Sequence, residues 1–134
     1  MKNRLYDASS LINVVRIGGS QSIRMLDGHH VLDLTIYEVS NVMWKLVYRE
    51  KKITQEQSSV LLDSVLLLMQ RMKVVSIGGL EKHVQELAVR EGLTAYDASY
   101  LAVAEHLDLV LVTDDRKLER AGRKYVKVLK TSDF

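Results

Sequence analysis

The stretch Leu109-Val110-Leu111-Val112-Thr113-Asp114-Asp115 decides the fold class of this chain. A continuous apolar run of this kind is typical of a strand that helices cover on both faces. The two acids that follow indicate a turn, and the segment from Arg116 predicts a short helix that ends at Gly122. A buried strand that leads directly into a helix favours an α/β fold with a parallel sheet.

On both sides of this stretch, short apolar strands alternate with segments of helical periodicity. Thr54 with Gln57 matches a capping box, and Thr35 and Thr94 are predicted to cap two further helices. The alternation predicts a three-layer α/β/α fold with a mostly parallel central sheet. Strands are expected at 4–7, 30–34, 73–77, 109–113 and 125–129, and helices at 8–15, 20–26, 36–49, 55–70, 80–90, 95–106 and 116–122.

The composition is that of an ordinary globular chain. Its 134 residues, 47% hydrophobic and 27% charged, suit one domain over residues 1–134. The absence of cysteine excludes disulfides, thiolate metal sites and a cysteine nucleophile. No apolar stretch reaches the roughly 20 residues of a spanning helix, and the N-terminus has no signal-peptide pattern. We therefore expect a cytoplasmic protein without a membrane partner, and the net charge of +2 permits a nucleic-acid partner.

Acidic residues occur where the predicted strands are followed by helices. Asp7 ends the first strand, Glu38 and Asp97 lie in the first turns of two helices, and Asp115 follows the most apolar strand with Asp114 beside it. In an open α/β sheet such positions meet in the crevice outside the carboxyl ends of the strands. Because clustered carboxylates repel one another unless a cation lies between them, the pattern predicts a site for a hard metal ion.

Most of these acids also have a local explanation. Acids in first turns are favoured by the helix dipole, by about 0.3–1 kcal/mol each. Asp97 could return a capping hydrogen bond three residues after Thr94, and Asp114 and Asp115 suit a turn. Asp7 has no evident local role, so the metal-site hypothesis depends on whether the acids converge.

Four segments in order along the chain carry a resemblance to a known family. They are Leu5-Tyr6-Asp7-Ala8-Ser9-Ser10-Leu11-Ile12, Glu38-Val39-Ser40-Asn41, Tyr96-Asp97-Ala98-Ser99-Tyr100-Leu101-Ala102 and Val112-Thr113-Asp114-Asp115-Arg116-Lys117-Leu118. Each is short, but together they resemble the signature stretches of PIN-domain ribonucleases, and more narrowly of VapC-type toxins. The resemblance covers the whole chain.

The resemblance implies a PIN-like fold and an endoribonuclease that depends on Mg²⁺ or Mn²⁺. It implies that this chain is the toxin of a toxin–antitoxin pair. Such a toxin would form a homodimer, cleave RNA and be neutralised by a VapB-type antitoxin. The implied metal ligands and catalytic residues are Asp7, Glu38, Asp97 and Asp115. Supporting roles are implied for Ser9, which would orient Asp7 or a water, for Asn41 and Thr113, and for Asp114 as a substitute for Asp115 or a group behind it.

Basic and aromatic residues extend this hypothesis. Arg116 and Lys117 follow the Asp115 turn and are candidates for contact with an RNA backbone. Tyr37, Trp44 and Tyr48 share a helical spacing; they could stack on bases, but packing against a neighbouring helix is favoured. The segment 60–69 is apolar almost all round, which indicates a second cover by a homodimer mate or an antitoxin helix, or else deep burial.

Other functions remain open at this point. His29-His30 is an alternative metal pair, disfavoured because adjacent residues of an extended chain point apart. A receiver-like phosphoacceptor domain, a metal-binding module without nuclease activity and an RNA-processing nuclease that is not a toxin are the competing classes. An Asp-x-Asp phosphatase is disfavoured because Ser9 occupies the position of the second acid.

Overall fold

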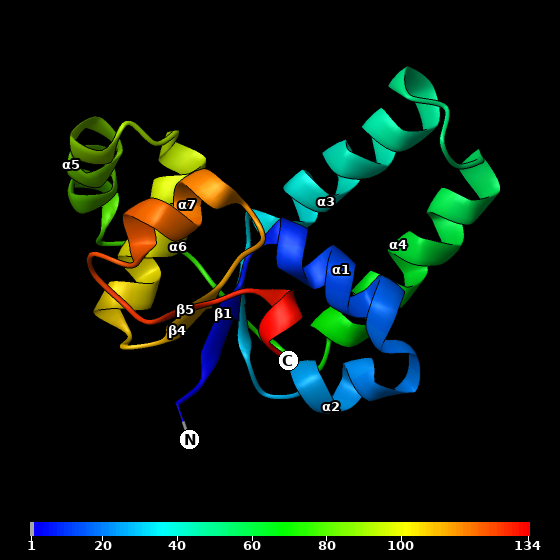
Figure 1. Cartoon of the computed structure of the whole chain (residues 1–134), viewed down its shortest axis with the longest axis horizontal. Coiled ribbons are helices and arrows are strands. Elements are labelled where there is room, and N and C mark those ends of the chain that lie inside the picture. The colour runs from blue at the N-terminus through cyan, green and yellow to red at the C-terminus, as the bar shows by residue number, and fades with distance from the viewer. Residues whose placement is uncertain (1) are drawn as a thin grey trace.

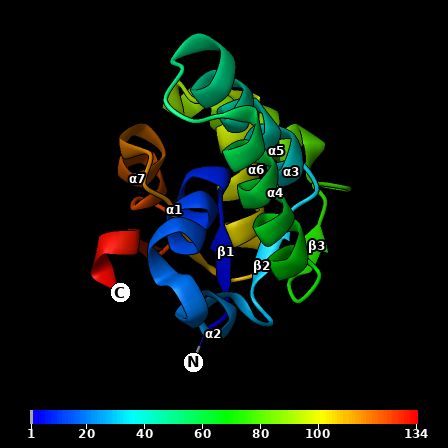
Figure 2. The same ribbon diagram turned by 90° about the vertical axis from the view of Figure 1, so that its right-hand side faces the viewer.

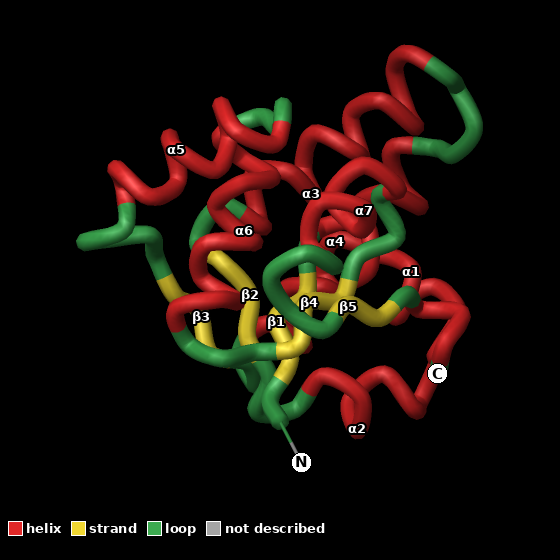
Figure 3. The backbone as a smooth tube through the Cα atoms, turned by 60° about the vertical axis from the view of Figure 1, so that its left-hand side comes forward, coloured by secondary structure: helices red, strands yellow, loops and turns green. Residues whose placement is uncertain are grey.

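A computed structural model describes residues 2–134, which form a five-stranded sheet covered by helices on both faces (Figure 1). The strand order is β3-β2-β1-β4-β5 and every neighbouring pair is parallel. The strands lie side by side, β1 at the centre (Figure 3). They are β1 Arg4–Tyr6, β2 His30–Leu32, β3 Lys73–Val75, β4 Val110–Val112 and β5 Val128–Leu129.

The helices divide between the two faces of the sheet. Helices α1 to α4 lie on one face and α5 to α7 on the other (Figure 1), and the turned view shows α1 and α4 across the first face (Figure 2). Their bounds are α1 Ala8–Gly18, α2 Ser22–Leu26, α3 Thr35–Trp44, α4 Gln55–Met69, α5 Glu81–Glu91, α6 Ala95–His106 and α7 Arg116–Gly122. A π-helical turn, Lys45–Arg49, continues α3, and short 3-10 turns occupy Gly19–Gln21 and Thr131–Asp133.

Alternation along the strands explains the two cores. Leu5 and Leu111, paired across β1 and β4, pack with α5, α6 and α7, whereas their successors Tyr6 and Val112 pack with α1 and α4. Successive side chains of a strand point to opposite faces, so an apolar strand supplies both cores at once. The predicted three-layer, mostly parallel fold is confirmed by this arrangement.

Local predictions were mostly confirmed, with a few corrections. The strands expected at 30–34 and 73–77 end two residues earlier, at Leu32 and Val75. The capping box of Thr54 and Gln57 and the Thr94 cap are present. The last strand covers only Val128–Leu129 rather than 125–129, because the chain after α7 first makes a turn. The helix expected at 36–49 changes to a π-helical turn at Lys45. Thr35 does not cap α3: its buried hydroxyl accepts from the Leu32 N–H at 3.1 Å.

Helix α4 is only partly covered. Val60 is 64% exposed and Leu67 is 65% exposed, whereas Val65 and Leu68 are buried. Deep burial of segment 60–69 is therefore wrong, and its outer side remains an apolar surface. None of the helices within residues 2–134 has the length and apolarity to cross a membrane.

Candidate active site

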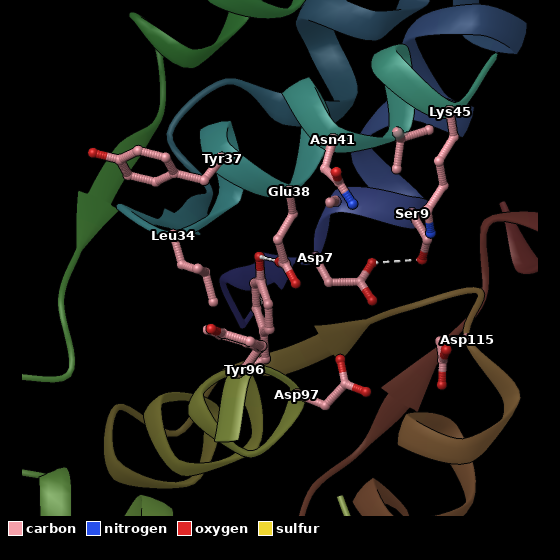
Figure 4. A pocket seen from close by; sticks show the side chains of 13 residues that line it. Asp7, Ser9, Leu34, Tyr37, Glu38, Asn41, Lys45, Tyr96, Asp97 and Asp115 are labelled. Carbon is pink, nitrogen blue, oxygen red and sulfur yellow. Dashed lines mark hydrogen bonds between the residues drawn. The ribbon is translucent and has the colours of Figure 1, made fainter. Parts of the chain in front are cut away.

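A hollow of about 640 Å³ opens at the carboxyl edge of the sheet, beside the strands β1 and β4. The chain runs from β1 to β2 on one side and returns to β4 on the other, so this edge is the topological switch point of the sheet. The four carboxylates of the sequence hypothesis lie around it (Figure 4). Its lining comprises Asp7, Ala8, Ser9, Leu34, Tyr37, Glu38, Asn41, Val42, Lys45, Tyr96, Asp97, Tyr100 and Asp115.

Asp7 is held more rigidly than its sequence position indicated. It is the N-cap of α1: its Oδ1 accepts from the Ser10 N–H at 2.9 Å, from the Ser10 hydroxyl at 2.9 Å and from the Ser9 hydroxyl at 2.8 Å. Its Oδ2 accepts from the Thr113 hydroxyl. The expectation that Asp7 lacks a local role was wrong. Burial raises the pKa of Asp7, against the effect of the bonds from Thr113 and Ser10.

Glu38 is positioned from the opposite face of the sheet. The Tyr100 hydroxyl of α6 donates to Glu38 Oε1 at 2.6 Å and also bonds to the Thr35 hydroxyl at 2.8 Å. Burial raises the pKa of Glu38, and the charge of Asp7 adds to the effect. Sequence reasoning did not select Tyr100, although its place three residues after Asp97 on one helix was a usable signal.

Asp97 has the least engaged carboxylate of the four. Its N–H donates to the Thr94 hydroxyl at 3.1 Å, but the hydrogen bonds of residues 2–134 include none to its carboxylate. Burial, and then the charges of Asp115, Glu38 and Asp7, raise the pKa of Asp97 to about 6. Mutual repulsion of this kind requires that the four acids share one space, which the local explanations do not account for.

The two neighbouring acids of the β4–α7 turn have different surroundings. Asp115 lines the cavity and caps α7, accepting from the Leu118 N–H at 2.8 Å. Asp114 bonds instead to Asn13 at 2.6 Å and to the Thr131 N–H and hydroxyl at 2.9 and 2.7 Å. Burial acts to raise the pKa of Asp114, but these hydrogen bonds outweigh it and the pKa is lowered. Asp114 therefore ties the turn to α1 and to the C-terminal segment.

We expect substitutions of Asp114 and Asp115 to have different effects on stability and on Mn²⁺ binding. Asp114→Ala should destabilise the protein by about 2 kcal/mol, because three donors lose a charged acceptor. It should leave Mn²⁺ affinity nearly unchanged, whereas Asp115→Asn should weaken Mn²⁺ binding at least about tenfold with a smaller change in stability. Urea denaturation and calorimetric Mn²⁺ titration measure both effects, and equal loss of Mn²⁺ affinity in the two variants would contradict the assignment.

The donor set fits a hard divalent cation. Carboxylate oxygens and the Asn41 side chain face one cavity, and such oxygens are the ligands that Mg²⁺ and Mn²⁺ prefer. As the side chains stand, no three acidic or histidine groups within residues 2–134 are close enough together to hold one ion. A divalent ion at this cavity would be held by the carboxylates that line it, Asp7, Glu38, Asp97 and Asp115.

The pKa values predict an unusual pH dependence of the metal-free protein. An acid whose folded pKa is raised destabilises the fold while ionised, so stability is regained as pH falls through the folded pKa. The folded pKa of Asp97 is about 6, above the usual value of 3.8 for an aspartate, and the pKa values of Asp7 and Glu38 are raised as well. We expect the free energy of unfolding to rise by about 1 kcal/mol between pH 7.5 and 5.5 in EDTA, after allowance for solvent screening.

Urea denaturation across this pH range measures the effect. Asp97→Asn should flatten the rise, and the matched surface substitution Glu86→Gln should not. A wild-type protein that loses stability steadily from pH 7.5 to 5.5 would contradict this prediction.

The remaining candidates lie in several places. Arg116 and Lys117 are exposed on α7 outside the cavity lining, and the Lys117 charge is near enough to lower the pKa of Asp97. Lys45, which the sequence reasoning missed, lines the cavity; its place seven residues after Glu38 on one helix was the available signal. The alternative pair His29-His30 lies away from this lining, and His29 Nδ1 accepts from the Arg4 N–H at 3.0 Å.

The helix-packing expectation for the three aromatic residues was wrong. Tyr37 lines the cavity and is 74% exposed. Trp44 and Tyr48 are also exposed, and their rings stack on each other with centroids 5.8 Å apart.

The fold and the cavity together define a parallel α/β protein with a four-carboxylate site at the carboxyl edge of its sheet. The chain belongs to the PIN-domain family, whose model, described as PIN domain, matches residues 5–124. Among curated relatives, a protein named ribonuclease VapC3 from Pyrobaculum aerophilum is 37% identical over 89 residues, 66% of this chain and 67% of that protein. A second, named exonuclease VapC9 from the same organism, is 44% identical over 88 residues, and the match spans only 62% of its length.

Solved structures agree with this placement. The crystal structure of PAE2754 from Pyrobaculum aerophilum has a TM-score of 0.80 at 32% identity, covering 98% of this chain and 85% of that one. The structure of VapBC-1 from nontypeable Haemophilus influenzae has a TM-score of 0.62 at 16% identity, covering 96% and 98%. The second likeness shows the shared fold alone.

Proposed function

We propose that residues 1–134 act as a single PIN-like nuclease domain, an Mg²⁺- or Mn²⁺-dependent endoribonuclease that hydrolyses RNA phosphodiester bonds. The observation that carries the proposal is the convergence of Asp7, Glu38, Asp97 and Asp115 on one cavity at the switch point of the sheet. The names of the VapC relatives support the reaction class.

The residues of the cavity would have different roles in binding a divalent ion and a phosphate. Asp7 is fixed by four hydrogen bonds, so its carboxylate provides a preorganised anchor. The Tyr100 hydroxyl orients Glu38, and Asp97 remains free to move toward a cation. Lys45 adds a positive charge to the same cavity, where a phosphate would be attracted. When bound, the divalent ion would lower the pKa of a water and offset charge on the scissile phosphate.

Cleavage of a circular RNA tests this proposal. A circle has no ends, so its conversion to a linear product requires endonuclease activity, which matters because one relative is named an exonuclease. We expect linearisation with Mn²⁺ or Mg²⁺ and none in EDTA. Cleavage of a linear RNA only would identify an exonuclease, and full cleavage in EDTA would overturn the metal-dependent mechanism.

The competing classes have distinct expectations. A receiver-like phosphoacceptor needs an accessible aspartate, but Asp7 is 5% exposed and both of its carboxylate oxygens accept hydrogen bonds. A binding module without nuclease activity would bind Mn²⁺ without linearising the circle. Neither class is favoured by a feature of this cavity.

We further propose that the protein is the toxin of a type II toxin–antitoxin pair, acting in the cytoplasm and neutralised by a VapB-type antitoxin. The solved VapBC relatives of the same fold support such a partner. Expression of the chain alone should arrest growth of a bacterial host, and the Asp97→Asn variant should not. Unimpaired growth with an active enzyme would favour an RNA-processing role.

We propose a homodimer whose mate covers the outer side of α4. Val60, Leu66 and Leu67 expose apolar surface there, and Val74 of the edge strand β3 is also exposed. Sedimentation analysis should show a dimer for the wild type and a monomer for Leu67→Asp, because a buried charge at an apolar interface is costly. A dimer that survives this substitution would place the interface elsewhere.

A further inference from the structure

Two aromatic rings line the acidic cavity without a visible structural role. Tyr37 of α3 is 74% exposed and Tyr96 of α6 is 62% exposed, yet both border the same hollow as the four acids. The hydrogen bonds and ring contacts recorded for residues 2–134 include neither side chain, in contrast to the stacked pair Trp44 and Tyr48. Their faces are therefore free for a ligand.

Each ring is tied to an acid through the backbone. Tyr37 immediately precedes Glu38, and Tyr96 immediately precedes Asp97, in the first turns of their helices. Neighbouring side chains on a helix diverge by about 100°, so an acid can point into the hollow while the ring before it forms the rim. The helices α3 and α6 thus hold the backbone of each tyrosine at a fixed offset from the acid that follows it.

The cavity is chemically asymmetric. Tyr37, Tyr96 and Leu34 occupy one side of the Glu38 and Asp97 carboxylates, whereas Lys45 approaches from the side of Ser9 (Figure 4). An apolar, aromatic side next to a cluster that would bind a metal-bridged phosphate matches the layout of a nucleotide, with a flat base beside its charged backbone. Every base has a π face, so stacking on tyrosine does not require a particular sequence.

We propose that Tyr37 and Tyr96 form a base-stacking subsite, which holds an unpaired nucleobase next to the scissile phosphate. This inference rests on the proposed nuclease function and assigns Tyr37 and Tyr96 a role in holding its RNA substrate. A base within a duplex is stacked on its neighbours and paired, so it reaches the rings only after the duplex opens. The subsite therefore selects unpaired segments over duplex.

Substitution of each ring tests the subsite. Tyr37→Ala and Tyr96→Ala should each lower kcat/KM on a short single-stranded RNA by about 5- to 150-fold, the range expected for loss of one base stack. Tyr37→Phe and Tyr96→Phe keep the ring and should restore most of the activity. Tyr48→Ala is the matched control, since Tyr48 is an exposed tyrosine outside the cavity lining.

Removal of the base gives the decisive comparison. We compare RNA substrates that each lack one base at a different position near the cleavage site. The wild type should cleave poorly only the substrate whose missing base would occupy the subsite. At that position the tyrosine-to-alanine variants should show little further loss, because ring and base act as one interacting pair. The subsite would be overturned if the losses from the missing base and from the tyrosine-to-alanine change were fully additive. Wild-type rates in both alanine variants, or equal cleavage of duplex and single-stranded RNA, would also overturn it.

A binding measurement separates this inference from the nuclease proposal. Fluorescence anisotropy with a labelled single-stranded RNA and Mn²⁺ reports binding whether or not the RNA is cut, and the Asp97→Asn background prevents cleavage. If the wild type cleaves no RNA, the nuclease proposal fails. In that case the subsite proposal still holds if RNA affinity decreases when either ring or the base is removed. If RNA affinity is unchanged, the subsite proposal is wrong as well.

Discussion

Asp97→Asn should abolish RNA cleavage while the protein remains folded and, without metal, becomes more stable than the wild type. The Asp97 carboxylate contributes to no hydrogen bond recorded for residues 2–134, so its loss removes no contact of the fold. Its pKa is raised to about 6 by burial and by three neighbouring acids, which means that its negative charge opposes folding at pH 7.5. The amide has nearly the same shape and carries no charge.

The loss of activity should be large because a metal site requires the charge that the fold disfavours. We expect kcat/KM to fall at least about 1000-fold, since electrostatic stabilisation at the scissile phosphate is the main catalytic contribution of such a site. The free energy of unfolding in EDTA should rise by about 1 kcal/mol at pH 7.5, a value that includes a discount for solvent screening. Cleavage assays and urea denaturation of the same preparation measure the two effects.

Glu86→Gln on the exposed surface of α5 is the matched control for this experiment. It removes the same charge far from the cavity and should change neither cleavage nor stability appreciably. Retained cleavage by Asp97→Asn, or a clear loss of its stability, would show that Asp97 serves the fold rather than the site.

Asp7→Ala should abolish cleavage and also destabilise the protein by about 3 kcal/mol. Asp7 caps α1 and accepts from Ser9, Ser10 and Thr113, so alanine leaves several buried donors without an acceptor. Loss of an N-cap costs about 0.5–2 kcal/mol and an unsatisfied buried donor about 1–3 kcal/mol. Removal of a buried charge with a raised pKa offsets part of this loss.

Urea denaturation in EDTA at pH 7.5 measures this stability change without a contribution from bound metal. Ser9→Ala is the control, because it removes one of the donors but keeps the cap and the carboxylate, and it should cost about 1 kcal/mol or less. Equal stability of Asp7→Ala and the wild type would show that the hydrogen bonds around Asp7 are not maintained in solution. The opposite stability effects of Asp7 and Asp97 would distinguish an anchored ligand from a free one.

Much of the fold could be predicted from patterns along the chain. The apolar run Leu109–Val112 had to be covered on both faces, and β4 does supply the two cores alternately. Glycines and capping residues marked the ends of most helices within one or two positions, since these signals act locally. The errors lie where a tertiary contact overrides a local preference, as at Thr35, whose hydroxyl bonds to Leu32 and Tyr100 instead of capping a helix.

For the acids, too, the sequence predicts some features and the tertiary structure decides others. Their positions at strand-to-helix junctions follow from the order of elements, because the carboxyl ends of parallel strands share one edge. Which of Asp114 and Asp115 faces the cavity does not follow, since adjacent residues in a turn are equivalent in a pattern. The bonds from Asn13 and Thr131, distant in sequence, direct Asp114 away from the cavity.

The sequence by itself therefore determined the fold class, the acids Asp7, Glu38 and Asp97, and the pair Asp114–Asp115 as the source of the fourth, since periodicity, capping and strand-end position depend on neighbouring residues. The run from Leu109 to Asp115 already contained a buried strand, the turn and one site acid. The tertiary structure alone decided how each acid is held. Asp7 is anchored by hydrogen bonds and Glu38 is oriented by Tyr100, whereas the Asp97 carboxylate makes none of the hydrogen bonds described and its pKa is raised. Hydrogen-bond partners, desolvation and charge repulsion are set by residues far apart in the chain, and only folding brings these together.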